Sequence, residues 1–210
     1  MNINKGEKIA KELKRNYPNP KTELNYMNEY ELVVAVALSA QTTDRKVNEV
    51  TPILFKKYPG WSELKNADIS ELKEIIKPVN FYKGKAERLI LAAEYIVRKH
   101  SGIVPNTIEQ LIKIPGYARK SANVILKELW GKAEGIVVDT HVSRVSMRLG
   151  LTDRKEPVKI EQDLISVIPK EYWVNFSGSA VLHGRYTCTA RKPKCDKCFL
   201  NKLCNSAFKV

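Results

Sequence analysis

The chain has 210 residues, which is long enough for one full-sized domain or for two closely associated halves. A hydrophobic fraction of 43% excludes a disordered or fibrous protein. No apolar run approaches the ~18 residues of a membrane span, and the N-terminus lacks the apolar core of a signal peptide. We therefore expect an intracellular, cytoplasmic protein without a membrane partner. The net charge of +13 favours a nucleic acid partner, although a lysine-rich proteome would produce the same charge.

Apolar residues at helical spacing predict helices along most of the chain. The expected helices lie before Pro18, at 30–40, from 44 through Leu54, around 70–77, at 85–99, 107–113, 119–129, 160–168 and 176–185. Thr43 or Asp44 is the expected cap of the helix at 44–54, and Asp68 or Ser70 that of the helix at 70–77. The only candidate strand is Gly135–Val138. The sequence therefore predicts an all-α fold.

Two helix–hairpin–helix arrangements follow one another, one around Pro78–Gly84 and one at 107–130. In the second, Thr107 and Gln110 match a capping box, and Pro115-Gly116 forces a sharp turn between two helices. The backbone N–H groups of such a turn can converge on a phosphate. An ordinary helical hairpin in a bundle fits the local pattern equally well.

Lys120 and Asp139 are the candidate chemical groups near this turn. Lys120 lies in the first turn of its helix, where the dipole disfavours a positive charge, and partial burial would further favour a neutral, nucleophilic amine. The alternative is a solvated lysine. Asp139 directly follows Val137 and Val138, a position at which a carboxylate is usually a helix cap.

None of the four cysteines precedes residue 188, and their spacing is Cys188-x6-Cys195-x2-Cys198-x5-Cys204. A reducing compartment argues against disulfides, so a metal or cluster site is favoured. Four thiolates can bind zinc or a [4Fe–4S] cluster. By spacing alone zinc is the commoner choice, because neither usual ferredoxin pattern is present.

Four segments together resemble the endonuclease III family, the DNA glycosylase/AP lyases of the helix-hairpin-helix–Gly/Pro–Asp superfamily. They are Ile114–Val124, Val138–Val145, Leu38–Asp44 and Leu182–Cys188. The resemblance extends over essentially the whole chain. It implies a six-helix barrel at 24–133 that contains the helix-hairpin-helix, and a second lobe formed by 1–23 and 134–210 with a cluster loop at 188–204.

The resemblance also implies the role of each chemical group. Lys120 would attack C1′ of the damaged nucleotide and form a Schiff base, and Asp139 would stabilise the oxocarbenium charge and assist the lysine. A carboxylate near the sugar suits this role, because breaking an N-glycosidic bond creates positive charge there. The four cysteines would hold a [4Fe–4S] cluster in place of zinc.

The implied partner is double-stranded DNA with a damaged base or an abasic site, bound by a monomer. The base must leave the duplex, with Gln41 filling the vacated space and Phe81 acting as an apolar wedge, unless Phe81 belongs to the core. The expected phosphate contacts are Pro115, Gly116, Tyr117, Ala118 and Arg119 in the hairpin, with Arg191, Lys192 and Lys194 in a basic loop between the first two cysteines.

The chain departs from the family pattern at two places. Tyr117-Ala118 replaces the usual Val-Gly, and the alanine is strained only if its φ is positive. Asn80 stands where relatives often have glycine, next to the wedge residue. Neither departure affects Lys120 or Asp139.

The leading function is a bifunctional glycosylase/AP lyase that acts on damaged, oxidised pyrimidines. The runner-up is a monofunctional glycosylase for mismatched thymine, uracil or adenine, whose members usually lack a lysine at the position of Lys120. A non-catalytic DNA-binding module is the third possibility, and it would need neither Lys120 nor Asp139.

Overall fold

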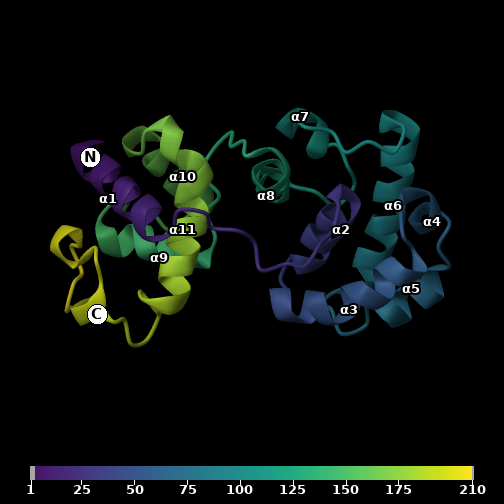
Figure 1. Ribbon diagram of the computed structural model, residues 1–210, viewed down its shortest axis with the longest axis horizontal. Helices are drawn as coiled ribbons and strands as arrows, with labels where there is room; N and C mark the ends of the chain where they lie inside the picture. Colours follow the sequence, from purple (N-terminus) through teal and green to yellow (C-terminus); the bar gives the residue numbers. More distant parts are fainter. Residues whose placement is uncertain (1–2, 210) are drawn as a thin grey trace. The chain divides into compact units, whose positions relative to one another are not determined.

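The computed structural model describes residues 3–209 (Figure 1). These residues contain helices and irregular connections but no strand, so the predicted all-α fold is confirmed. The candidate strand Gly135–Val138 is wrong, because this segment is an irregular connection that leads into a helix. None of the helices formed by residues 3–209 is long and apolar enough to cross a bilayer.

Contacts within the chain divide it into two compact units. One consists of Met1–Thr22 and Gly131–Val210, and the other of Glu23–Trp130. Each unit has a hydrophobic core of its own.

The unit Glu23–Trp130 contains the helix-hairpin-helix. Its helices are α2 (Glu29–Ser39), α3 (Asp44–Lys57), α4 (Trp61–Lys65), α5 (Ile69–Ile75), α6 (Tyr82–His100), α7 (Ile108–Leu111) and α8 (Arg119–Trp130). Helix α6 begins three residues before the predicted start, and α7 is shorter than predicted. The short helix α4, which packs on α6, was not predicted.

Helix α2 is the centre of this unit. It packs against α3, α6 and α8, and its apolar residues are buried at successive positions, with Leu32, Val33, Val34 and Ala35 fully inaccessible to solvent. A helix that is apolar on every side must lie inside the fold, because it has no polar face to turn toward water.

Polar side chains cap several of these helices. Asn28, Thr43 and Asp68 each accept a hydrogen bond from a backbone N–H in the first turn of α2, α3 and α5. Thr107 precedes α7 as predicted, but its hydroxyl contacts the Gln110 side chain at 3.4 Å and caps no backbone N–H. The expected capping box is therefore wrong.

The other unit is built from four α-helices, namely α1 (Ile3–Asn16), α9 (Thr140–Leu149), α10 (Pro157–Val167) and α11 (Trp173–Tyr186). Helix α1 packs on α10 and α11, and α11 packs on α9. A short 3₁₀ turn, η1 (Lys170–Tyr172), lies between α10 and α11, and two more, η2 (Cys195–Lys197) and η3 (Asn201–Leu203), follow α11. The last two belong to the cysteine-containing segment at the C-terminal end.

A tight contact between α1 and the end of α10 gives a prediction about stability. A Cβ added to Gly6 would approach the carbonyl oxygen of Val167 and lie 2.8 Å from its carbonyl carbon, so the two backbones would have to separate. We expect Gly6→Ala to lower the free energy of unfolding by about 1–3 kcal/mol, as overpacking does. Chemical denaturation followed by circular dichroism measures this value.

Gly84→Ala is the matched control, because Gly84 also lies in a helix but a Cβ there would meet no atom within 4 Å. It should raise the free energy of unfolding by up to about 1 kcal/mol through helix propensity alone. Equal stability of the two variants would contradict the close approach of α1 and α10.

Candidate active site and cluster loop

The hairpin between α7 and α8 is held by glycine geometry and by a buried tyrosine. Gly116 has a φ of +89°, and a Cβ there would lie 3.2 Å from the Cβ of Arg88 on α6, so both conformation and space require glycine. The Tyr117 hydroxyl donates a 2.9 Å hydrogen bond to the carbonyl oxygen of Val33 inside α2. Burial raises the pKa of this tyrosine, which keeps it a neutral donor.

The Tyr117-Ala118 departure from the family hairpin causes no backbone strain. The non-glycine residues with positive φ in the described chain are Gln41, Phe81, Ser101 and Phe208, and Ala118 is not among them. The carbonyl of Ala118 accepts from the N–H of Ala122 as the first bond of α8. Ala118 therefore occupies an ordinary position before a helix, where a side chain costs little.

Lys120 lies in the first turn of α8 with its side chain exposed. It makes no hydrogen bond or ion pair to the residues that the structure describes. The expectation of partial burial is wrong for this state of the protein. Its amine is therefore free to meet a bound molecule without first breaking an ion pair.

Asp139 is the N-cap of α9. Its Oδ1 atom accepts a 2.8 Å hydrogen bond from the N–H of Val142, which confirms that Asp139 caps the helix. The other carboxylate oxygen makes no hydrogen bond within residues 3–209, and the side chain is half-buried. Lys120 belongs to the unit Glu23–Trp130 and Asp139 to the other unit.

The structure brings Gln41 and Phe81 together at one place in the unit Glu23–Trp130. The Asn80 side chain donates a 2.6 Å hydrogen bond to the carbonyl of Gln41, and the Asn80 N–H donates to the Thr42 hydroxyl at 3.2 Å. Phe81 is 70% exposed, so its alternative assignment to the core is wrong. A glycine at position 80 could not make the first of these bonds.

Lys85 was not identified from sequence, although it lies directly beneath these two loops. Its side chain is only 7% exposed, and its ammonium donates to the carbonyls of Leu38 and Ala40 and to the Thr42 hydroxyl at 2.7, 2.6 and 3.0 Å. Burial lowers the pKa of Lys85 to about 8. The available signal was its position one turn before Leu89, on the inward face of α6, where a lysine is rarely found.

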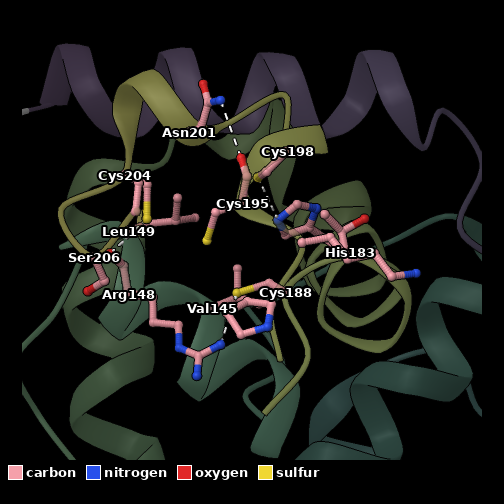
Figure 2. A pocket seen from close by; sticks show the side chains of 14 residues that line it. Val145, Arg148, Leu149, His183, Cys188, Cys195, Cys198, Asn201, Cys204 and Ser206 are labelled. Carbon is pink, nitrogen blue, oxygen red and sulfur yellow. Dashed lines mark hydrogen bonds between the residues drawn. The ribbon is translucent and has the colours of Figure 1, made fainter. Parts of the chain in front are cut away.

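The four cysteines line one pocket in the C-terminal part of the chain, together with residues of α9 and with His183 of α11. Figure 2 shows their side chains around a common hollow. All four are free thiols, and the empty space here amounts to about 400 Å³ with its opening to solvent included. The lining residues of α9 are Val145, Arg148 and Leu149.

Two arginines of α9 hold the cysteine loop in place. Arg148 donates to the carbonyls of Thr189 and Ala190 at 2.7 and 2.9 Å and approaches Cys188 Sγ at 3.4 Å (Figure 2). Arg144 donates to the Cys188 carbonyl at 3.1 Å. Sequence reasoning missed both, and the only signal was a pair of arginines one turn apart on a helix that begins directly after Asp139.

Both candidate metal groups take thiolate ligands. Zinc needs all its ligands at ~2.3 Å from one point. A [4Fe–4S] cluster binds each thiolate through a different iron, so its ligands stand further apart around a larger group. The pocket lined by all four cysteines provides the ligand set that a [4Fe–4S] cluster requires.

The predicted basic loop lies between Cys188 and Cys195. Arg191, Lys192 and Lys194 all have exposed side chains. The loop is closed internally, because the Thr189 hydroxyl donates to the Lys192 carbonyl at 2.7 Å and the Lys194 N–H donates to the Thr187 carbonyl at 3.0 Å. Three positive side chains thus project from a fixed backbone.

Comparison with known proteins agrees with this arrangement. Residues 34–170 match the family model described as HhH-GPD superfamily base excision DNA repair protein. Residues 188–204 match the iron-sulfur binding domain of endonuclease III, which agrees with the four-cysteine pocket.

Relatives match over nearly the full length. Endonuclease III of Synechocystis sp. is 46% identical over 93% of this chain and 89% of its own. A structure described as a non-covalent endonuclease III–DNA complex superimposes with a TM-score of 0.89, at 35% identity, over 99% of this chain and 97% of its own. A trapped endonuclease III–DNA covalent intermediate matches with a TM-score of 0.86, at 37% identity, over 94% and 93% of the two chains. The chain belongs to the endonuclease III family within the HhH-GPD superfamily of base excision DNA repair proteins.

Proposed function

We propose that this protein is a bifunctional DNA N-glycosylase and AP lyase that removes an oxidised pyrimidine and then cleaves the abasic strand. The observation that carries the proposal is the exposed, unpartnered amine of Lys120 in the first turn of α8, directly after the hairpin. The matching structure of a trapped endonuclease III–DNA covalent intermediate supports a covalent route for this chain.

The Lys120 amine is the nucleophile. Its attack on C1′ forms a carbon–nitrogen bond while the glycosidic bond breaks and the base leaves. The C1′–O4′ bond then breaks, O4′ takes up a proton as a hydroxyl group, and a carbon–nitrogen double bond forms at C1′. This Schiff base acidifies the hydrogen on C2′ and allows β-elimination, in which the 3′ phosphate leaves. Because Lys120 is exposed in the free protein, its amine can reach the sugar of a bound nucleotide.

Asp139 provides the compensating negative charge. The bond that breaks leaves positive charge on the sugar, and a fixed carboxylate close to the sugar stabilises that charge. The hydrogen bond from Val142 to Oδ1 fixes the carboxyl group and leaves the second oxygen available. A helix cap and a catalytic carboxylate are therefore compatible roles for the same side chain.

The other assigned residues bind and distort the DNA. In the hairpin 115–119 the phosphate donors are the N–H groups of Gly116 and Ala118, because Pro115 has no N–H and the Tyr117 N–H donates to the carbonyl of Ile114. In the basic loop, phosphates contact Arg191, Lys192 and Lys194. Gln41 and Phe81, both exposed on adjacent loops, occupy the space that the extruded base leaves. We assign the hairpin to a barrel lobe at 24–133 and the cysteines to a lobe formed by 1–23 and 134–210. The division of contacts after Thr22 and Trp130 supports these limits to within a few residues.

Cys188, Cys195, Cys198 and Cys204 would hold the [4Fe–4S] cluster. When bound, the cluster would link the four cysteines through iron–sulfur bonds. It would take no part in base removal. The residues of this chain do the positioning: Arg144 and Arg148 fix the backbone on which the basic loop is mounted. Leu200 of this segment is buried in the core of its unit, and the metal link would fix the remaining loop.

The alternatives are less favoured. A monofunctional glycosylase uses water as its nucleophile and has no use for Lys120. A purely DNA-binding module would not need the combination of Lys120 and Asp139.

The cluster assignment predicts the metal content. Freshly purified protein should absorb in the visible region and contain about four iron and four sulfide ions per chain, as the formula of the cluster requires. Replacing Cys195 by serine should remove most of that absorbance. A colourless protein with one zinc ion per chain would contradict the assignment.

The covalent route predicts the behaviour of Lys120→Gln. Wild-type protein with abasic duplex DNA and borohydride should yield a stable protein–DNA adduct on a denaturing gel, and Lys120→Gln should yield none, because it has no amine to form the Schiff base. Lys56→Gln on α3, which also removes one exposed charge from this unit, should still be trapped. Adduct formation by Lys120→Gln would contradict the assignment of Lys120 as the nucleophile.

The dual role of Asp139 predicts that two substitutions differ. Asparagine caps helices about as well as aspartate, so Asp139→Asn should keep stability and DNA binding while slowing base removal by about a hundredfold. Asp139→Ala should in addition lose about 1 kcal/mol of stability with the cap. Single-turnover kinetics and melting curves measure the two effects. If Asp139→Asn lost DNA binding and base removal to the same extent, Asp139 would act only as a structural cap.

A further inference from the structure

The C-terminal end of α2 runs from the buried Leu38 to the exposed Ala40, and the hydrogen bond to the Leu38 carbonyl is buried. The last carbonyls of a helix have no partner within the helix and need one outside it. Many helices end on a glycine in left-handed conformation, but α2 ends at Ala40 with φ −57° and ψ 116°. Lys85, a residue of α6, provides the partner, because its ammonium donates to the carbonyls of Leu38 and Ala40.

The Lys85 ammonium has all three of its donors satisfied. Its third hydrogen bond goes to the Thr42 hydroxyl at 3.0 Å. An ammonium group has three N–H donors, so these partners use its full capacity and fix its position. Burying a charge in this way is costly, and the cost indicates that the geometry at this point matters for more than packing.

The same atoms connect two loops that are distant in sequence. The Thr42 hydroxyl also accepts the N–H of Asn80, and the Asn80 side chain donates to the carbonyl of Gln41. Gln41 and Phe81, with φ of 54° and 60°, both have left-handed backbones, which non-glycine residues rarely adopt without support from their surroundings. Both side chains are exposed beside this network.

We propose that Lys85, Thr42 and Asn80 lock the Gln41 loop and the Phe81 loop into one preformed element that enters DNA as a single unit. Lys85 is thus a positioning residue for base extrusion, which it controls without touching the nucleotide. The role in DNA rests on the proposed function, whereas the mechanical connection of the two loops does not.

A single unit suits base extrusion better than two independent loops. Both side chains must be in place at the same time to keep the duplex from closing again on the extruded base. If the two loops were mobile in the free protein, ordering them during binding would cost conformational entropy. A preformed element avoids that cost. Small displacements of positioning groups slow a reaction strongly.

Lys85→Met tests the proposal, because methionine retains most of the buried volume and removes all three donors. Lys83→Met is the matched control, since Lys83 is exposed on the same turn of α6 and loses the same charge. The first substrate is a duplex with one thymine glycol, and the second is the same duplex with a preformed abasic site, which has no base to extrude.

We expect Lys85→Met to slow single-turnover base removal by about ten- to a hundredfold. Strand cleavage at the preformed abasic site should slow by less than about threefold. Lys83→Met should leave the ratio of the two rates unchanged. Equal slowing of both steps by Lys85→Met would overturn the proposal, because a general loss of folding or binding affects both alike.

Hydrogen exchange of the DNA-free protein tests the connection itself. Thr42→Val keeps the shape of the side chain and removes the acceptor shared by Lys85 and Asn80, so the Asn80 amide should exchange at least about tenfold faster. Amides 40–43 should follow, while those in the middle of α2 should not change. Faster exchange throughout α2 would show a merely structural role and contradict the proposal.

The two tests separate the possible failures. If Lys85→Met does not fold, Thr42→Val provides both the rate ratio and the exchange measurement. If wild-type protein removes no base and forms no adduct, the proposed function fails. The exchange rates then still decide whether the two loops are connected.

Discussion

The burial of the apolar middle of α2 is the constraint on which the unit Glu23–Trp130 depends. A helix without a polar face brings its backbone polar groups into the interior, and each carbonyl that lacks a helical partner must find one there. Two other elements donate to carbonyls of α2, one in the middle of the helix and one at its C-terminal end. Tyr117 of the hairpin bonds to the carbonyl of Val33, and Lys85 of α6 bonds to the carbonyls of Leu38 and Ala40. The demands of one buried helix thus fix both the phosphate-binding hairpin and the two exposed loops.

The cysteine loop is held by a different principle. It contains only short 3₁₀ turns, so it has little regular backbone hydrogen bonding of its own. Arg144 and Arg148 compensate by donating to carbonyls along the loop, and the four thiols face one pocket. The loop is therefore organised by ligands and arginine contacts, as is common where a segment is too small to form a core. Its exposed basic side chains gain a fixed backbone from this arrangement.

Much of the fold could be predicted from the spacing of apolar residues, because most helices bury one face or all of their surface. The boundaries of α2 and α8 were within one residue of their predicted positions. The spacing of apolar residues did not reveal α4, because this helix has only five residues and its position depends on packing against α6. The Thr107 capping box failed because its hydroxyl contacts the Gln110 side chain and not a backbone N–H.

The site was predictable where a motif carries the chemistry, and unpredictable where distant groups meet. The cysteine spacing indicated a shared pocket, which the structure contains. Nothing in the sequence indicated that Lys85 would satisfy the end of α2, some 45 residues earlier, or that Asn80 would bind the Gln41 loop. Such contacts depend on how helices pack, and packing partners cannot be derived from a local pattern.

The central claim is that the amine of Lys120 forms the covalent bond to DNA. The decisive measurement is mass spectrometry of the borohydride-reduced adduct after proteolysis and removal of the DNA, which locates the modified residue. The account predicts the sugar-derived mass on Lys120 of α8 alone. Modification of the N-terminal amine or of any other lysine, with Lys120 unmodified, would contradict it.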